Sequence, residues 1–134
     1  RIKFTIQPMK KLVLLGDEAI AQGAIGIECR QGDSEVESLL AALDDQKTHT
    51  RILAERAMNA RLQGGCQVPI GGYAEIEQGV IVIRGLVGRP DGSEVVHGVI
   101  SGRPVDGEEL GDVLGQDLLS RGADAILKER KAAV

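Results

Sequence analysis

The hydrophobic pattern of this chain changes from a helical to a strand period at Gly64-Gly65, and this change constrains the fold more than any other feature. Ahead of it, apolar residues recur at three- and four-residue steps, namely Ile52, Leu53, Ala57, Met58 and Leu62. This spacing predicts an amphipathic helix that Thr48 caps and that runs through Leu62. A glycine placed directly after it can take the left-handed conformation that ends a helix.

Three short apolar runs follow Cys66, at residues 68–76, 80–87 and 94–100. They contain many β-branched residues, and turn-forming residues separate them at 77–79 and 90–92. Because such short turns join antiparallel neighbours, the pattern predicts a three-stranded antiparallel meander. One face of that sheet must be covered.

A helix from about Glu108 to Arg121 is predicted to supply the cover, with Asp106 as its cap and Gly122 at its end. Its inner side carries Leu110, Val113, Leu114, Leu118 and Leu119. Residues 123–130 add a last short helix or strand. The fold class expected for residues 46–134 is therefore α+β, a small three-stranded antiparallel sheet covered on one face by helices.

Upstream of this unit the sequence predicts one strand and one helix. Residues 24–29 form a short apolar run, read as a buried strand that ends at residues 30–32. Ser34 is expected to open a helix through reciprocal capping with Glu37, and Leu39, Leu40 and Leu43 form its apolar side. Residues 1–23 show weak periodicity, and no element is assigned to them.

Composition excludes several classes of protein. Only two aromatic residues occur, so the core must be aliphatic, and 16 basic against 20 acidic residues give a net charge of −4. An acidic chain without a basic stripe is a poor candidate for nucleic-acid binding. Two cysteines make neither a disulfide scaffold nor a structural zinc site, so we expect no metal and a reducing, cytoplasmic setting. Gly16 interrupts the apolar run at 12–15, so neither an export signal nor a membrane span is expected.

The segment from Glu55 to Gly71 is the most informative for chemistry, because it ends a helix, turns on two glycines and presents one thiol, Cys66, before a strand. An inert, partly buried thiol is the simplest interpretation. A catalytic thiolate is the second, but the partial negative charge of a helix C-terminus disfavours it, and neither His49 nor His97 is an obvious base. The local sequence better suits a sulfur that is alkylated once.

This segment resembles the cofactor-attachment signature of porphobilinogen deaminase, also called hydroxymethylbilane synthase. Residues 22–30, 84–87 and 90–93 resemble further segments of that family, so the likeness covers most of residues 20–134. Ile20-Ala21 departs from the Val-Gly pair that is usual there.

The resemblance implies a transferase that condenses four porphobilinogen molecules head to tail, with loss of ammonia, to hydroxymethylbilane in tetrapyrrole (haem) biosynthesis. It implies that Cys66 carries a dipyrromethane cofactor through a thioether, that Gly64 and Gly65 shape the loop, and that Gln22 lies near the cofactor. The family's catalytic aspartate and arginine cluster belong to its N-terminal portion, so no catalytic residue is expected in this chain. The whole enzyme is expected to be a monomer.

By the same resemblance we expect the chain to be a C-terminal portion of such an enzyme. Residues 1–17 would end the second domain, residues 18–45 would be the strand-helix remnant of the first, α/β domain, and residues 46–134 would be the cofactor-carrying domain. Alone it would be inactive, and residues 24–43 would keep apolar surface uncovered. Two alternatives stay open: a non-catalytic binding or assembly module that keeps the cysteine loop, and an unrelated cysteine-dependent enzyme.

Other features favour ordinary explanations. Residues 21–26 approximate a dinucleotide-binding pattern but lack its first glycine. The carboxylates at 108, 109, 112 and 117 are expected on the solvated side of a helix. Arg56 and Arg61 could bind cofactor carboxylates, but ion pairs with nearby acids are expected to hold them.

Overall fold

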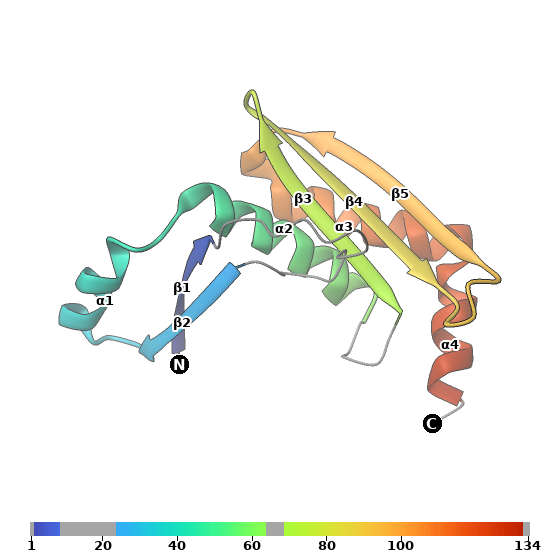
Figure 1. Cartoon of the computed structure of the whole chain (residues 1–134), viewed down its shortest axis with the longest axis horizontal. Helices are drawn as coiled ribbons and strands as arrows, with labels where there is room; N and C mark the ends of the chain where they lie inside the picture. The colour runs from blue at the N-terminus through green and yellow to red at the C-terminus, as the bar shows by residue number, and fades with distance from the viewer. Residues whose placement is uncertain (1, 9–23, 64–68, 133–134) are drawn as a thin grey trace.

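The computed structural model describes residues 2–8, 24–63 and 69–132, and Figure 1 shows how their helices and strands are arranged. Two antiparallel sheets are present, a pair β1-β2 and a sheet in the order β3-β4-β5. In chain order the elements are β1 (Ile2–Pro8), β2 (Ala24–Arg30), α1 (Ser34–Ala41), α2 (Gln46–Arg61), β3 (Ile70–Glu77), β4 (Val80–Gly88), β5 (Val95–Gly102), η1 (Pro104–Asp106), α3 (Gly107–Leu118), η2 (Leu119–Ala123) and α4 (Asp124–Ala132).

The predicted meander is confirmed in β3, β4 and β5. Each strand pairs antiparallel with the next, with Tyr73 opposite Arg84 and Arg84 opposite Val99. The first turn places Gln78 at φ 50° and Gly79 at φ 76°. Two left-handed residues in a two-residue loop make the turn whose twist matches that of paired strands.

Helices α2 and α3 cover one face of this sheet (Figure 1), which confirms the α+β class. Alternate residues of β4 point into the interface between the sheet and the two helices, and Ile81, Ile83 and Val87 are fully buried there. The aliphatic core that composition predicts consists of Ala54, Met58, Leu62, Ala74, Ile81, Ile83, Val87, Leu114, Leu118, Ala123, Ile126 and Leu127.

Helices α2 and α3 approach each other along a stripe of glycines four residues apart, Gly107, Gly111 and Gly115, all of them buried. A Cβ atom built on Gly111 would lie 2.1 Å from the carbonyl oxygen of Ala54, and one on Gly115 would lie 2.7 Å from the Cβ of Arg61. At Gly111 and Gly115 the helix backbones are therefore closer than a side chain would allow.

The capping contacts of the helices differ from the predicted ones. Asp45, not Thr48, caps α2, because its carboxylate accepts from the amide of Thr48 at 2.7 Å. Asp33, not Ser34, caps α1. Asp106 does occupy the cap position of α3, but its carboxylate accepts from Arg103 at 2.8 Å and makes no capping bond. For α1 and α2 the carboxylate of an aspartate ahead of the predicted residue supplies the cap, and for α3 the predicted carboxylate is bound by an arginine.

The covering helix ends earlier than predicted. Helix α3 stops at Leu118, and the five-residue π-type turn η2 leads into α4. Gly122 lies within this turn at φ 115°, a backbone conformation that residues with a Cβ rarely adopt, so a helix end near it is confirmed. Residues 124–132 form a helix, and its Ile126 and Leu127 are buried against the core.

The N-terminal elements contain one strand that was not predicted, β1, which pairs with β2 over seven residues each and whose residues from Ile2 to Gln7 alternate between apolar and polar. The predicted strand at 24–29 is present, but of its describable side chains Ala24, Ile27 and Cys29 are only half-buried, so its predicted burial is wrong. None of the eight residues of α1, all within the described ranges, is buried, and Leu39 is 70% exposed. The uncovered apolar surface expected in this region is present. In the described ranges no helix has the length and apolar character needed to span a membrane.

Candidate functional site

The chain enters the predicted cysteine loop from the C-terminus of α2. Leu62 is 2% exposed, so the last turn of the helix is held in the core. The amides of Leu62 and Gln63 donate to the carbonyls of Met58 and Ala60, each at 3.0 Å. Gln63 has φ 54°, so the residue that leaves the helix in a left-handed conformation is a glutamine, one position ahead of the two glycines.

The chain leaves the loop at Pro69, whose carbonyl accepts from the amide of Gly88 at 3.0 Å. The strand β3 then begins at Ile70, two residues later than the predicted start, and Ile70 pairs with Val87. Pro69 has no amide hydrogen to donate, which suits the first position before a strand. Both ends of the loop are therefore fixed to the core of the same α+β unit.

The predicted site residues themselves lie outside the described residues. Gly64, Gly65 and Cys66 fall between Gln63 and Pro69, and Gln22 falls in the segment between β1 and β2. Their assigned roles stay predictions. The other cysteine, Cys29, is half-buried in β2, in a different sheet from the one that follows the loop.

Glu55 is a feature of this region that sequence reasoning missed. It is 2% exposed, and its Oε1 accepts from the amide of Ala74 in β3 at 2.9 Å. A signal was available, because Glu55 stands three residues from both Ile52 and Met58 and therefore on the apolar face of α2. A buried carboxyl group is tolerated where hydrogen bonds satisfy it.

Arg61, a candidate for binding cofactor carboxylates, is bound to Asp112 of α3. Its Nε and Nη2 donate to the two oxygens of that carboxylate at 2.7 and 2.8 Å. The hydrogen bond from Arg61 holds the pKa of Asp112 below its usual value and raises that of the guanidinium. The predicted ion pair is confirmed, although it joins two helices and does not run along one. Arg56 is exposed on α2.

Other arginines are also bound to carboxylates. The pairs are Arg84 with Glu75, Arg89 with Glu94 and Glu129, Arg103 with Asp106, and Arg121 with Asp117. A guanidinium held by a neighbouring carboxylate has less attraction left for an anionic ligand. Each of these arginines has a carboxylate partner within the chain.

The two histidines occupy ordinary positions. His49 lies 3.2 Å from the carboxylate of Asp44, and His97 is exposed on β5 opposite Leu86. Within the described ranges, no three His, Cys, Asp or Glu side chains come together in a way that could hold a metal ion.

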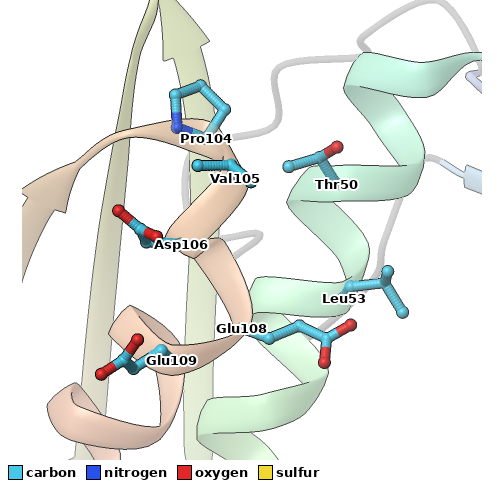
Figure 2. Close-up of a pocket in the computed structure, with 7 residues that line it drawn as sticks. All are labelled: Thr50, Leu53, Pro104, Val105, Asp106, Glu108 and Glu109. Carbon is cyan, nitrogen blue, oxygen red and sulfur yellow. The ribbon is translucent and has the colours of Figure 1, made fainter.

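A surface depression of about 470 Å³ lies between α2 and the start of α3. Figure 2 shows the side chains that line it, Thr50, Leu53, Pro104, Val105, Asp106, Glu108 and Glu109. Three of the seven are carboxylates, which repel a ligand that carries carboxylates itself. None of the seven belongs to the segment from Glu55 to Gly71, so this depression is separate from the cysteine loop in its residues.

A comparison with protein families finds a match to the C-terminal domain of porphobilinogen deaminase over residues 49–120. The matched range contains most of α2, the predicted cysteine loop, the whole meander and α3. It contains every core residue from Ala54 to Leu118, while Ala123, Ile126 and Leu127 of the same core follow it.

Proposed function

This chain belongs to the porphobilinogen deaminase family through its C-terminal domain, and from this premise we propose that it is the cofactor-carrying part of a hydroxymethylbilane synthase. The reaction proposed for the whole enzyme joins four porphobilinogen molecules head to tail, with loss of ammonia, in tetrapyrrole (haem) biosynthesis. Cys66 is the proposed attachment point, through a thioether to a dipyrromethane. We place the enzyme in the cytoplasm, as a monomer.

The family match over residues 49–120 is the observation that carries this proposal. The geometry on either side of the loop supports it, because the bond between Gly88 and Pro69 and the buried Leu62 hold the two chain ends. A tether for a growing product needs such fixed ends, since a sulfur on a freely moving segment would not return to one place. When attached, the cofactor supplies the end to which substrate units are added.

In this proposal the chain tethers the cofactor, and another portion of the enzyme carries the catalytic residues. Each condensation needs a proton donor beside the ring nitrogens and cations for the substrate's carboxylates. The net charge of −4 and the arginines already bound to carboxylates support a role for this chain in tethering. The exposed apolar side chains of α1, such as Leu39, support the proposal that residues 18–45 belong with a domain supplied by the rest of the enzyme.

Intact-protein mass spectrometry tests the attachment. The chain is produced together with a complementary N-terminal portion of a family enzyme, and an adduct with the mass of a dipyrromethane is expected. Cys66→Ser should abolish the adduct and Cys29→Ser should leave it unchanged. An unmodified Cys66 in the co-produced protein would contradict the proposal. Ester or peptide hydrolysis that depends on Cys66 in the isolated chain would identify a cysteine-dependent enzyme instead.

A further inference from the structure

Two side chains of α2 bind both main-chain polar groups of one residue in β3. The amide of Ala74 donates to Glu55 Oε1 at 2.9 Å, and the carbonyl of Ala74 accepts from Arg51 Nε at 2.5 Å. The guanidinium of Arg51 also lies 5.3 Å from the centre of the Tyr73 ring. Arg51 and Glu55 are four residues apart, so they project from the same side of the helix. We call this arrangement the Ala74 clamp.

The clamp lies on an outer strand of the sheet. In the order β3-β4-β5, only one side of β3 is paired with another strand. An outer strand presents unpaired amides and carbonyls, which another chain can approach or which neighbouring groups can satisfy. At Ala74 the side chains of Glu55 and Arg51 bind the amide and the carbonyl that a further strand could otherwise pair with.

Stability alone does not account for a carboxyl group in this position. Glu55 is 2% exposed, and Ile52 and Met58, each three residues from it in α2, are buried as well. Replacing buried charged or polar groups by apolar ones of similar volume is often neutral or stabilising, and their best-attested use is to specify register. A buried polar contact of this kind selects one alignment of two elements over others.

Two residues near the start of β3 have no side chains that could fix the alignment of this strand against α2. Gly71 and Gly72 are buried but have no side chains that could interlock with α2. Pairing with β4 aligns β3 within the sheet, but it does not place β3 against the helix that precedes the loop. Strands rich in glycine are weakly specified in register, and a slip of one residue moves the chain by about 3.3 Å.

We propose that Glu55 and Arg51 are positioning residues, which set the alignment of β3 against α2 and thereby the place where the cysteine loop is held. The loop has only five residues between Gln63 and Pro69, so a slip of β3 would displace its exit relative to its entry. The importance of that displacement for cofactor attachment rests on the proposed function of Cys66. The clamp itself consists of described residues alone.

The test uses the chain produced in cells that cannot make porphobilinogen, so that Cys66 is free. Glu55→Met removes the acceptor at similar volume, and Glu55→Gln keeps an oxygen that can accept from Ala74. Amide hydrogen exchange is measured for the peptide covering residues 69–77, and alkylation by a maleimide is followed at Cys66 and Cys29 in the same molecule. Glu55→Met is expected to raise exchange at least tenfold and to raise the ratio of Cys66 to Cys29 alkylation at least threefold. Glu55→Gln should stay within twofold of the parent chain.

Leu127→Ala is the matched control, because Leu127 is buried in α4 and is not part of the Ala74 clamp. It should lower global stability without changing the alkylation ratio. If it changes the ratio as much as Glu55→Met does, or if Glu55→Met leaves the ratio unchanged, the inference is overturned. Should Glu55→Met not fold, Arg51→Met removes the other arm of the clamp and is judged by the same two measurements. A missing dipyrromethane adduct would overturn the attachment at Cys66 but would leave these measurements unaffected.

Discussion

Substitution of the glycines between α2 and α3 tests the packing at its closest point. Alanine at Gly111 would place a Cβ atom 2.1 Å from the carbonyl oxygen of Ala54. The backbones would have to separate by about 0.9 Å to bring that distance to the 3.0 Å that real Cβ atoms keep. Because the contact is with backbone, no side-chain rotation can relieve it.

The expected magnitude is the difference between two effects. Alanine in place of glycine in a helix interior favours the helix by about 1 kcal/mol. Overpacking of a close-packed interior costs about 1–3 kcal/mol, occasionally more, and a backbone contact of this kind belongs at the upper end. We therefore expect Gly111→Ala to lower the free energy of unfolding by about 2 kcal/mol. The melting temperature should fall by roughly 10 °C.

The same helix provides graded controls. At Gly115 a Cβ would meet the Cβ of Arg61 at 2.7 Å and the carbonyl of Met58 at 3.0 Å, so a loss of about 1 kcal/mol is expected. At Gly107 the nearest atom is the terminal methyl of Ile81 at 3.3 Å, which can move, so the change should be near zero.

Urea unfolding followed by circular dichroism measures all three variants, with the slope of the transition as a check that the unfolding remains two-state. The expected order of destabilisation is Gly111, then Gly115, then Gly107. If Gly111→Ala proves as stable as Gly107→Ala, helix separation does not limit the packing and the reasoning is wrong.

Three further predictions concern local contacts. Asp45→Ala should lower the free energy of unfolding by about 1 kcal/mol. Asp45→Asn should change it little, because the amide oxygen of asparagine can cap α2 as the carboxylate oxygen does. The hydrogen bond from Thr48 lowers the pKa of Asp45. The ionised carboxylate therefore contributes its full stabilisation of the folded state above the unfolded pKa of about 3.9, and this stabilisation is lost as the pH falls through the folded pKa. Urea titrations at pH 2 to 7 should show that the stability of Asp45→Asn depends less on acid. A double-mutant cycle of Arg61→Ala and Asp112→Ala should give a small favourable coupling that shrinks in 1 M salt, and a coupling unaffected by salt would contradict the exposed ion pair. Gln78→Asn should raise stability by roughly 0.5 kcal/mol in thermal melts, since asparagine favours the left-handed turn conformation, and a loss would show that the turn is of another type.

Local patterns determined much of the secondary structure and its class. The change of period at Gly64-Gly65 separated a helix from strands, and the turns at 77–79 and 90–92 made the meander antiparallel. These features depend on residues close together in sequence, so periodicity and turn chemistry are enough to identify them. The resemblance carried by residues 55–71 pointed to the family that the match over 49–120 then showed.

Boundaries and weak elements were less predictable. Asp45 and Thr48 are both good capping residues, and the structure has Asp45 as the cap and Thr48 buried in the first turn of α2. The strand β1 was missed although Ile2, Phe4 and Ile6 alternate with polar residues, the period that is typical of a strand.

The sequence by itself determined that a helix, a thiol loop, an antiparallel meander and a covering helix follow one another, because each is encoded within a few residues. Only the tertiary structure decided which residues of different helices and strands come into contact. It brought Glu55 to Ala74, Arg61 to Asp112 and the backbone of Ala54 to Gly111. Those contacts join residues 19 to 57 positions apart, and the docking of α2 on β3 and α3, which no local pattern specifies, creates them.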